Sequence, residues 1–142
     1  MSKQLLKSLK TLIKVEKAKI SELQPTLHDL SNKIAEIEQQ ITILNETLIR
    51  EKNFLNDQIL SIDFINFFNR IEMEKKNLLI EKEILLEEYN ILHDEMMEYV
   101  KIEKSYETIS NRLKSTLEYE KEKKEFDTIE DLILMRKNAT TF

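Results

Sequence analysis

The sequence predicts an all-α fold: a long, two-helix antiparallel coiled-coil hairpin whose second helix overhangs the first. Apolar residues recur every seven positions in the first half of the chain, and they recur again in the second half with a different phase. Such a heptad pattern places one apolar face of a helix against a partner helix. The chain also contains no Gly, the residue that tight turns between strands commonly require.

The first helix is expected at about residues 3–60. Its heptad positions are all apolar, and they are Leu6, Ile13, Ile20, Leu27, Ile34, Ile41, Leu48, Leu55 and Ile62. The positions three residues later are mostly apolar too: Leu9, Leu23, Leu30, Ile37, Leu44 and Ile65, with Glu16, Glu51 and Gln58 as exceptions. Pro25 lies away from this face and the apolar phase continues through it. We therefore expect a kink within one continuous helix at Pro25.

The phase of the apolar pattern changes near residues 56–63. Extending the first register leads to Asn69, Lys76 and Glu83, which are all polar. A second register begins two residues away from the first and contains Phe64, Ile71, Leu78, Leu85, Leu92, Tyr99, Tyr106 and Leu113. At about 100° per residue, an offset of two residues moves the apolar face by roughly 200°, to the opposite side of a continuous helix. A reversal of the chain explains this change.

We expect the turn at about residues 60–63 and the second helix at about 63–137, with Ser61 or Asp63 as its N-cap. Residues of the two helices should face each other where their numbers add up to roughly 122–124, as in an antiparallel pair of helices. The whole chain, residues 1–142, then forms a single, monomeric hairpin. Residues 138–142 are expected to be disordered, as chain ends often are.

Composition argues against several kinds of enzyme. Dinucleotide-binding folds, phosphate-binding loops and nucleophile elbows all need Gly, which is absent. Absence of Cys removes disulfides and zinc–thiolate sites. His28 and His93 would lie at similar heights in the hairpin, but no carboxylates accompany them, so we interpret both as surface residues. We expect no catalytic residues, no metal and no cofactor. No apolar run has the roughly 18 residues of a membrane span, and the start does not resemble a signal peptide.

The beginning of the chain is basic. Six lysines, Lys3, Lys7, Lys10, Lys14, Lys17 and Lys19, accompany a single acid, Glu16. A basic amphipathic helix can bind an anionic membrane or a nucleic acid. The simpler interpretation, which we prefer, is that these lysines flank the apolar face and pair with acids of the second helix, so that no nucleic acid is a partner.

Two apolar groups lie at the two ends of the second register. Phe64, Phe67 and Phe68 cluster after the reversal, and Phe67 is the one expected to be hardest to bury. Beyond the mixed-charge residues 118–125, Phe126, Ile129 and Ile133 follow at helical spacing, past the point where the first helix can cover them. An apolar helical stripe without an intramolecular partner indicates a binding surface. A frayed end or a contact within a homodimer are the alternatives.

Three short stretches carry a resemblance to a known family. They are Leu6-x-x-Leu9-Lys10-x-Leu12 followed by Glu16 and Ala18, then Ile65-Asn66-Phe67, and finally Glu122-x-Lys124-x-Phe126-Asp127 followed by Met135-Arg136-Lys137. The order of these stretches and the chain length of 142 residues resemble those of the stalk proteins of type III export systems. These are the flagellar FliJ family and its injectisome counterpart YscO.

The resemblance implies a non-enzymatic coupling component, similar to the central stalk of rotary ATPases. In this family the terminal end of the coiled coil enters the pore of a hexameric export ATPase and links it to the cytosolic domain of the export gate. Some members also bind export chaperones. The resemblance further implies a cytoplasmic protein that is at most peripherally bound to the cytoplasmic face of the inner membrane.

Carried over by motif, the resemblance also implies two sets of contact residues. Those for the ATPase are Lys7, Lys10, Lys124, Phe126, Asp127, Ile129, Ile133, Arg136 and Lys137. Those for the export gate are Phe67 and Met73, the nearest apolar residues outside the predicted contact face. Arg70 and Glu74, on the exposed side there, depart from the family's pattern.

Two other classes of protein are compatible with the pattern. One is a generic structural coiled coil that acts as a spacer or tether. The other is a prefoldin-like chaperone arm, which the lack of a β-hairpin pattern between the two helices disfavours.

Overall fold

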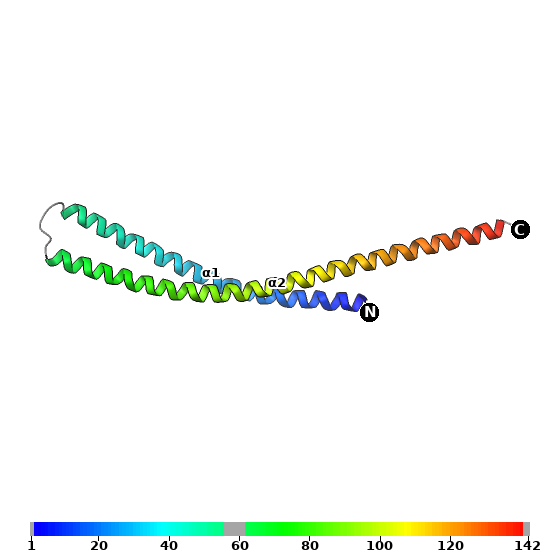
Figure 1. Ribbon diagram of the computed structural model, residues 1–142, viewed down its shortest axis with the longest axis horizontal. Coiled ribbons are helices and arrows are strands. Elements are labelled where there is room, and N and C mark those ends of the chain that lie inside the picture. Colours follow the sequence, from blue (N-terminus) through cyan, green and yellow to red (C-terminus); the bar gives the residue numbers. More distant parts are fainter. Residues whose placement is uncertain (1, 56–61, 141–142) are drawn as a thin grey trace. The chain divides into compact units, whose positions relative to one another are not determined.

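The protein consists of two long α-helices. The computed structural model describes residues 2–55 and 62–140, and all of them are helical (Figure 1). Helix α1 comprises Ser2–Leu55 and helix α2 comprises Ile62–Thr140. The all-α prediction with two packed helices is therefore confirmed.

The two helices contribute to two compact units. Of the described residues, the terminal unit combines residues 2–19 of α1 with residues 98–140 of α2, and the central unit contains residues 20–55 and 62–97. In each unit α1 and α2 lie side by side and run in opposite directions (Figure 1). In the terminal unit, Lys17 Nζ lies 3.8 Å from Glu103 Oε1. In the central unit, Lys82 Nζ lies 3.1 Å from Glu38 Oε1.

The register of this pairing differs slightly from the expected one. In both cross-helix ion pairs the two residue numbers add up to 120, whereas the sequence suggested roughly 122–124. No Gly or Pro marks the turn, so no residue of the sequence fixes the reversal to one position. The predicted turn residues 60 and 61, including the candidate N-cap Ser61, lie outside the described residues.

The buried face of α1 is the predicted one. Leu9 in the terminal unit and Leu27, Leu30, Ile34 and Ile37 in the central unit are its buried apolar residues. The other apolar positions of the register, from Leu6 to Leu48, are half-buried. Among the residues whose burial the structure describes, no side chain is completely enclosed, because one neighbouring helix can cover only one side of another. The first register was predicted to extend to Ile62, which is wrong, since Ile62 is an exposed residue of α2.

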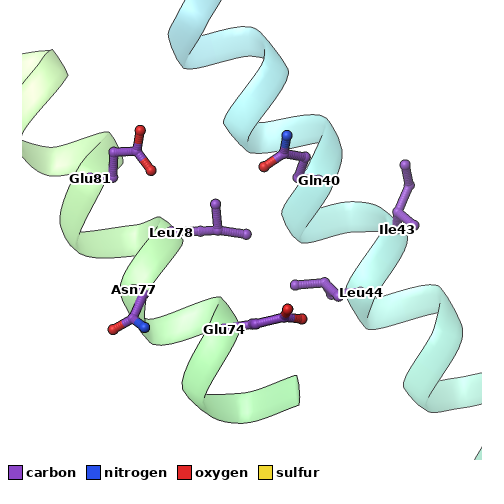
Figure 2. A pocket seen from close by; sticks show the side chains of 7 residues that line it. All are labelled: Gln40, Ile43, Leu44, Glu74, Asn77, Leu78 and Glu81. Carbon is purple, nitrogen blue, oxygen red and sulfur yellow. The ribbon is translucent and has the colours of Figure 1, made fainter. Parts of the chain in front are cut away.

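The contact face of α2 contains a second line of side chains that the sequence pattern did not reveal. Each residue of this line is less exposed than the residues directly before and after it in the sequence. The line consists of Lys75, Lys82, Tyr89, Met96, Glu103, Ser110 and Leu117. It runs beside the predicted line, in which Ile71 is buried and Leu78 to Leu113 are half-buried. Figure 2 shows part of the predicted line, where Leu78 of α2 and Leu44 of α1 point toward one another and line a hollow between the two helices.

Local residues explain the helix boundaries. Pro25 lies inside α1, as predicted. Its ring is exposed, and so is Ser21, whose carbonyl loses its helical N–H donor to Pro25 and can bond to water. Asp63 lies within the first turn of α2 and is not its N-cap; there its negative charge favours the helix N-terminus. The disordered tail predicted for 138–142 is wrong for Asn138–Thr140, which are helical.

Neither α1 nor α2 contains, within the described residues, a stretch that is long and apolar enough to cross a membrane.

Candidate partner-binding surface

The most prominent uncovered surface is the end of α2. We call residues 118–139 the overhang, because every one of them is exposed. Its apolar residues include Phe126, Ile129 and Ile133, which are 64%, 56% and 54% exposed. Leu132, Leu134 and Met135 are exposed as well. Exposed apolar side chains so close together are typical of a surface that another molecule covers.

Phe126, Ile129 and Ile133 form the overhang stripe, because spacings of three and four residues place them on one side of α2. This side is not a continuation of the face that packs on α1. From the half-buried Leu113 and Leu117 to the centre of the stripe, the helix turns through roughly 170° at about 100° per residue. A longer α1 would therefore not have covered the stripe.

The charged residues assigned to the ATPase contact divide between two sides of the overhang. Arg136 and Lys137 follow the stripe within a turn and lie on its side of the helix. Lys124 and Asp127 lie roughly 130–170° away from the stripe, on nearly the opposite side. The backbone carbonyl of Lys124 accepts a hydrogen bond from Thr128 Oγ1 at 2.8 Å. The charged and apolar parts of the motif thus do not form one patch.

The basic beginning of α1 is mostly without ion pairs. Of its six lysines, Lys17 pairs with Glu103 across the helices, and Lys19 pairs with Glu16 at 3.3 Å within α1. Lys7 and Lys10 are exposed and form no ion pair with any described residue. Among the described residues, the predicted pairing of the lysines with acids of the second helix is therefore observed for Lys17 alone.

Lys7 and Lys10 are also separate from the overhang stripe. In the observed register they lie opposite residues near Leu113 and Ser110 of α2, in the covered part of the terminal unit. From Leu113 to Phe126 the helix rises about 20 Å at 1.5 Å per residue. A partner must therefore extend along the terminal unit to contact both groups.

The two residues assigned to the export gate differ in exposure. Met73 is 61% exposed and borders a surface hollow together with Asn69 and Lys76. Phe67 is half-buried, and the Arg70 guanidinium lies 5.5 Å from the centre of its ring. Phe67 was expected to be outside the contact face and the least buried of the three phenylalanines, which is wrong. The 3–4 spacing of Phe64, Phe67 and Ile71 places it toward α1 instead.

Phe64 and Phe68 line an apolar hollow with three residues of α1. These are Leu48, Ile49 and Lys52, all in the central unit. Phe68 remains 42% exposed despite this contact. Phe68 is therefore more accessible than the half-buried Phe64 and Phe67.

A buried carboxylate lies in the terminal unit. Glu16 occupies a position of the α1 contact face and is only 6% exposed. Its Oε1 accepts a hydrogen bond from Lys19 Nζ at 3.3 Å, while its Oε2 has no hydrogen-bond partner among the described residues. Lys19 Nζ also lies 5.1 Å above the Tyr99 ring, which attracts a cation. The heptad pattern marked Glu16 as an exception, but it gave no sign of this arrangement around Lys19.

The histidines do not indicate a metal site. His93 is half-buried and its ring stacks on Tyr89, with centroids 5.9 Å apart and planes inclined by 17°, whereas His28 is exposed. Within residues 2–55 and 62–140, no group of three or more His, Cys, Asp or Glu side chains could hold a metal ion.

Comparison with known proteins adds no relative. No family model matches the chain, and no curated protein or solved structure matches it either. Functional inference therefore rests on the sequence and on the geometry of the two units.

Proposed function

We propose that the chain is a non-enzymatic stalk and coupling component of a flagellar or injectisome export apparatus. In this proposal the end of α2 inserts into the pore of a hexameric export ATPase, and the chain links the ATPase to the cytosolic domain of the export gate. The protein acts in the cytoplasm, peripheral to the inner membrane, and it can also bind export chaperones. The observation that carries the proposal is the exposed, helical overhang with its apolar stripe.

The distribution of residues on the overhang suits a pore. A helix inside a ring is contacted from all sides, so residues on opposite sides of it can both bind. Phe126, Ile129 and Ile133 then contact one wall of the pore and Lys124 and Asp127 another. Arg136 and Lys137 lie in the last turns of α2, where cations are favoured by the helix dipole.

The remaining assigned residues have more limited roles in this proposal. Lys7 and Lys10 would contact the mouth of the ring, since they lie on the covered part of the terminal unit. For the export gate, the exposed Met73 is the stronger contact residue, because Phe67 is half-buried under Arg70.

The experiment compares the full-length chain with a variant that lacks residues 126–142. We expect the full-length chain to raise the hexamer fraction and the hydrolysis rate of the cognate export ATPase, and the truncated chain to do neither. Both proteins should melt at nearly the same temperature, because all the deleted side chains that the structure describes are exposed. Ile133→Asp should reproduce the loss with a single substitution.

Ile91→Asp is the matched control, because Ile91 is equally apolar and exposed but lies in the central unit. Its stimulation of the ATPase should equal that of the unchanged chain. Equal stimulation by the full-length and truncated chains would show that the overhang is not the binding end. Absence of stimulation by either would favour a spacer or tether without an ATPase partner.

A further inference from the structure

The charged residues on the side of α2 that carries the overhang stripe change sign along the helix. Glu118 and Glu122 precede Phe126 on the same side of α2, and Arg136 and Lys137 follow Ile133 on that side. One end of this side is therefore acidic and the other is basic. The apolar residues between them occupy two helical turns, which is enough for a short helix–helix contact.

The stripe of one copy is complementary to the stripe of a second copy in antiparallel orientation. When two overhangs lie antiparallel, the acidic end of each stripe meets the basic end of the other, while the apolar residues pack in the middle. In particular, Glu122 of one copy comes within about one turn of Arg136 of the other. A parallel arrangement would instead place Glu122 against Glu122 and Arg136 against Arg136, and such like charges oppose association.

We infer that two copies of this chain associate through their overhang stripes in antiparallel orientation. The pair has a two-fold axis between Phe126 and Ile133, so that both copies use the same surface. Since few apolar layers contribute, the association is weak and reversible. It leaves the pairing of α1 with α2 in each copy unchanged, because the stripe faces away from α1.

This inference does not require the export ATPase. It goes beyond the proposed function by assigning the stripe a second copy as its occupant when no other partner is present. The two occupants exclude each other, since both cover Phe126, Ile129 and Ile133. Self-association then keeps the apolar stripe from water until a partner replaces it.

The experiment is sedimentation equilibrium of the full chain from about 1 µM to a few hundred µM, a range that resolves weak dimers. We expect a monomer–dimer equilibrium. Glu122→Arg and Arg136→Glu should each weaken the dimer about fivefold or more, because each creates like charges at both ends of the stripe. The double variant with both changes should restore the dimer, and so should an equimolar mixture of the two single variants.

Glu120→Arg is the matched control. It makes the same change of charge, but Glu120 lies on nearly the opposite side of α2, roughly 160° from the centre of the stripe. The control should dimerise like the unchanged chain, and circular dichroism should show equal helix content in all variants. A chain that stays monomeric over the whole range would overturn the inference. Dimers that weaken equally in the control and in the single variants, or that the double variant does not restore, would overturn it as well.

Discussion

Two consecutive stretches of α2 within the terminal unit, residues 98–117 and the overhang, have similar secondary structure but different surroundings. Both are entirely helical and both carry apolar residues at helical spacing. In the first stretch, Tyr99, Tyr106 and Leu113 are half-buried against α1 and Ser110 is buried. In the second, Phe126, Ile129 and Ile133 are all more than half exposed.

The comparison shows that helix formation and burial are determined separately in this chain. The exposed overhang is helical because it is rich in good helix formers and contains neither Gly nor Pro. Glu120 with Lys124 and Lys121 with Glu125 also have the i,i+4 spacing that favours a helix. Burial depends instead on whether α1 lies against the apolar side. The apolar side of the overhang points elsewhere, so its free energy of burial is available to a partner.

The largest expected effect tests this difference directly. Leu113→Asp places a charge against α1 and should lower the free energy of unfolding by about 2–4 kcal/mol. Ile133→Asp makes the same kind of change in the overhang and should alter the free energy of unfolding by less than about 0.5 kcal/mol. Urea denaturation followed by circular dichroism, at a concentration where the chain is monomeric, measures both. Equal losses would mean that the overhang packs on the rest of the chain.

A smaller effect of opposite sign is expected at the buried carboxylate. Glu16→Leu should raise the free energy of unfolding by about 1–2 kcal/mol, because it removes a buried oxygen without a hydrogen-bond partner and adds an apolar side chain to the contact face. Glu22→Leu, at an exposed position of α1, is the control and should change the stability by less than about 0.5 kcal/mol. A loss of stability in Glu16→Leu would show that the contact with Lys19 outweighs the cost of burial.

The smallest effect is expected for the ion pair across the terminal unit. Lys17 and Glu103 are 3.8 Å apart, and the lysine side chain is largely exposed. Solvent screens such a pair, so a double-mutant cycle of Lys17→Met and Glu103→Gln should give a coupling of less than about 0.5 kcal/mol. A coupling above about 1 kcal/mol would mean that charge pairing, and not apolar contact, determines where α1 meets α2 in this unit.

The fold and the α1 contact face could be predicted from the sequence because the pattern there has few exceptions. From Leu6 to Leu48 nearly every contact position is Leu or Ile, and the phase persists through Pro25. For α2 the pattern revealed one line of contact residues and missed the other. That second line contains Lys75, Lys82, Glu103 and Ser110, and polar residues at these positions do not differ from those of a solvated face.

The candidate binding surface was only partly predictable for a related reason. The exposure of Phe126, Ile129 and Ile133 was predicted from the lengths of the two helices, but the orientation of the stripe, away from the contact face of α2, was not predicted. The position of Phe67 was not predicted either, because three phenylalanines within five residues fit more than one helical face. Contacts around Lys19 depend on side-chain directions that heptad spacing does not specify.

The antiparallel register also has a consequence for folding order. In the central unit, residues such as Leu48 and Phe68 meet after closing a short segment of chain, whereas Lys17 and Glu103 in the terminal unit are separated by most of the sequence. Loop closure costs more entropy for the longer segment, unless the shorter one has closed first. Helix pairing should therefore proceed like a zipper from the central unit to the terminal unit, and local opening should begin at the start of α1. Amide hydrogens of residues 2–19 should accordingly exchange faster than those of residues 27–37.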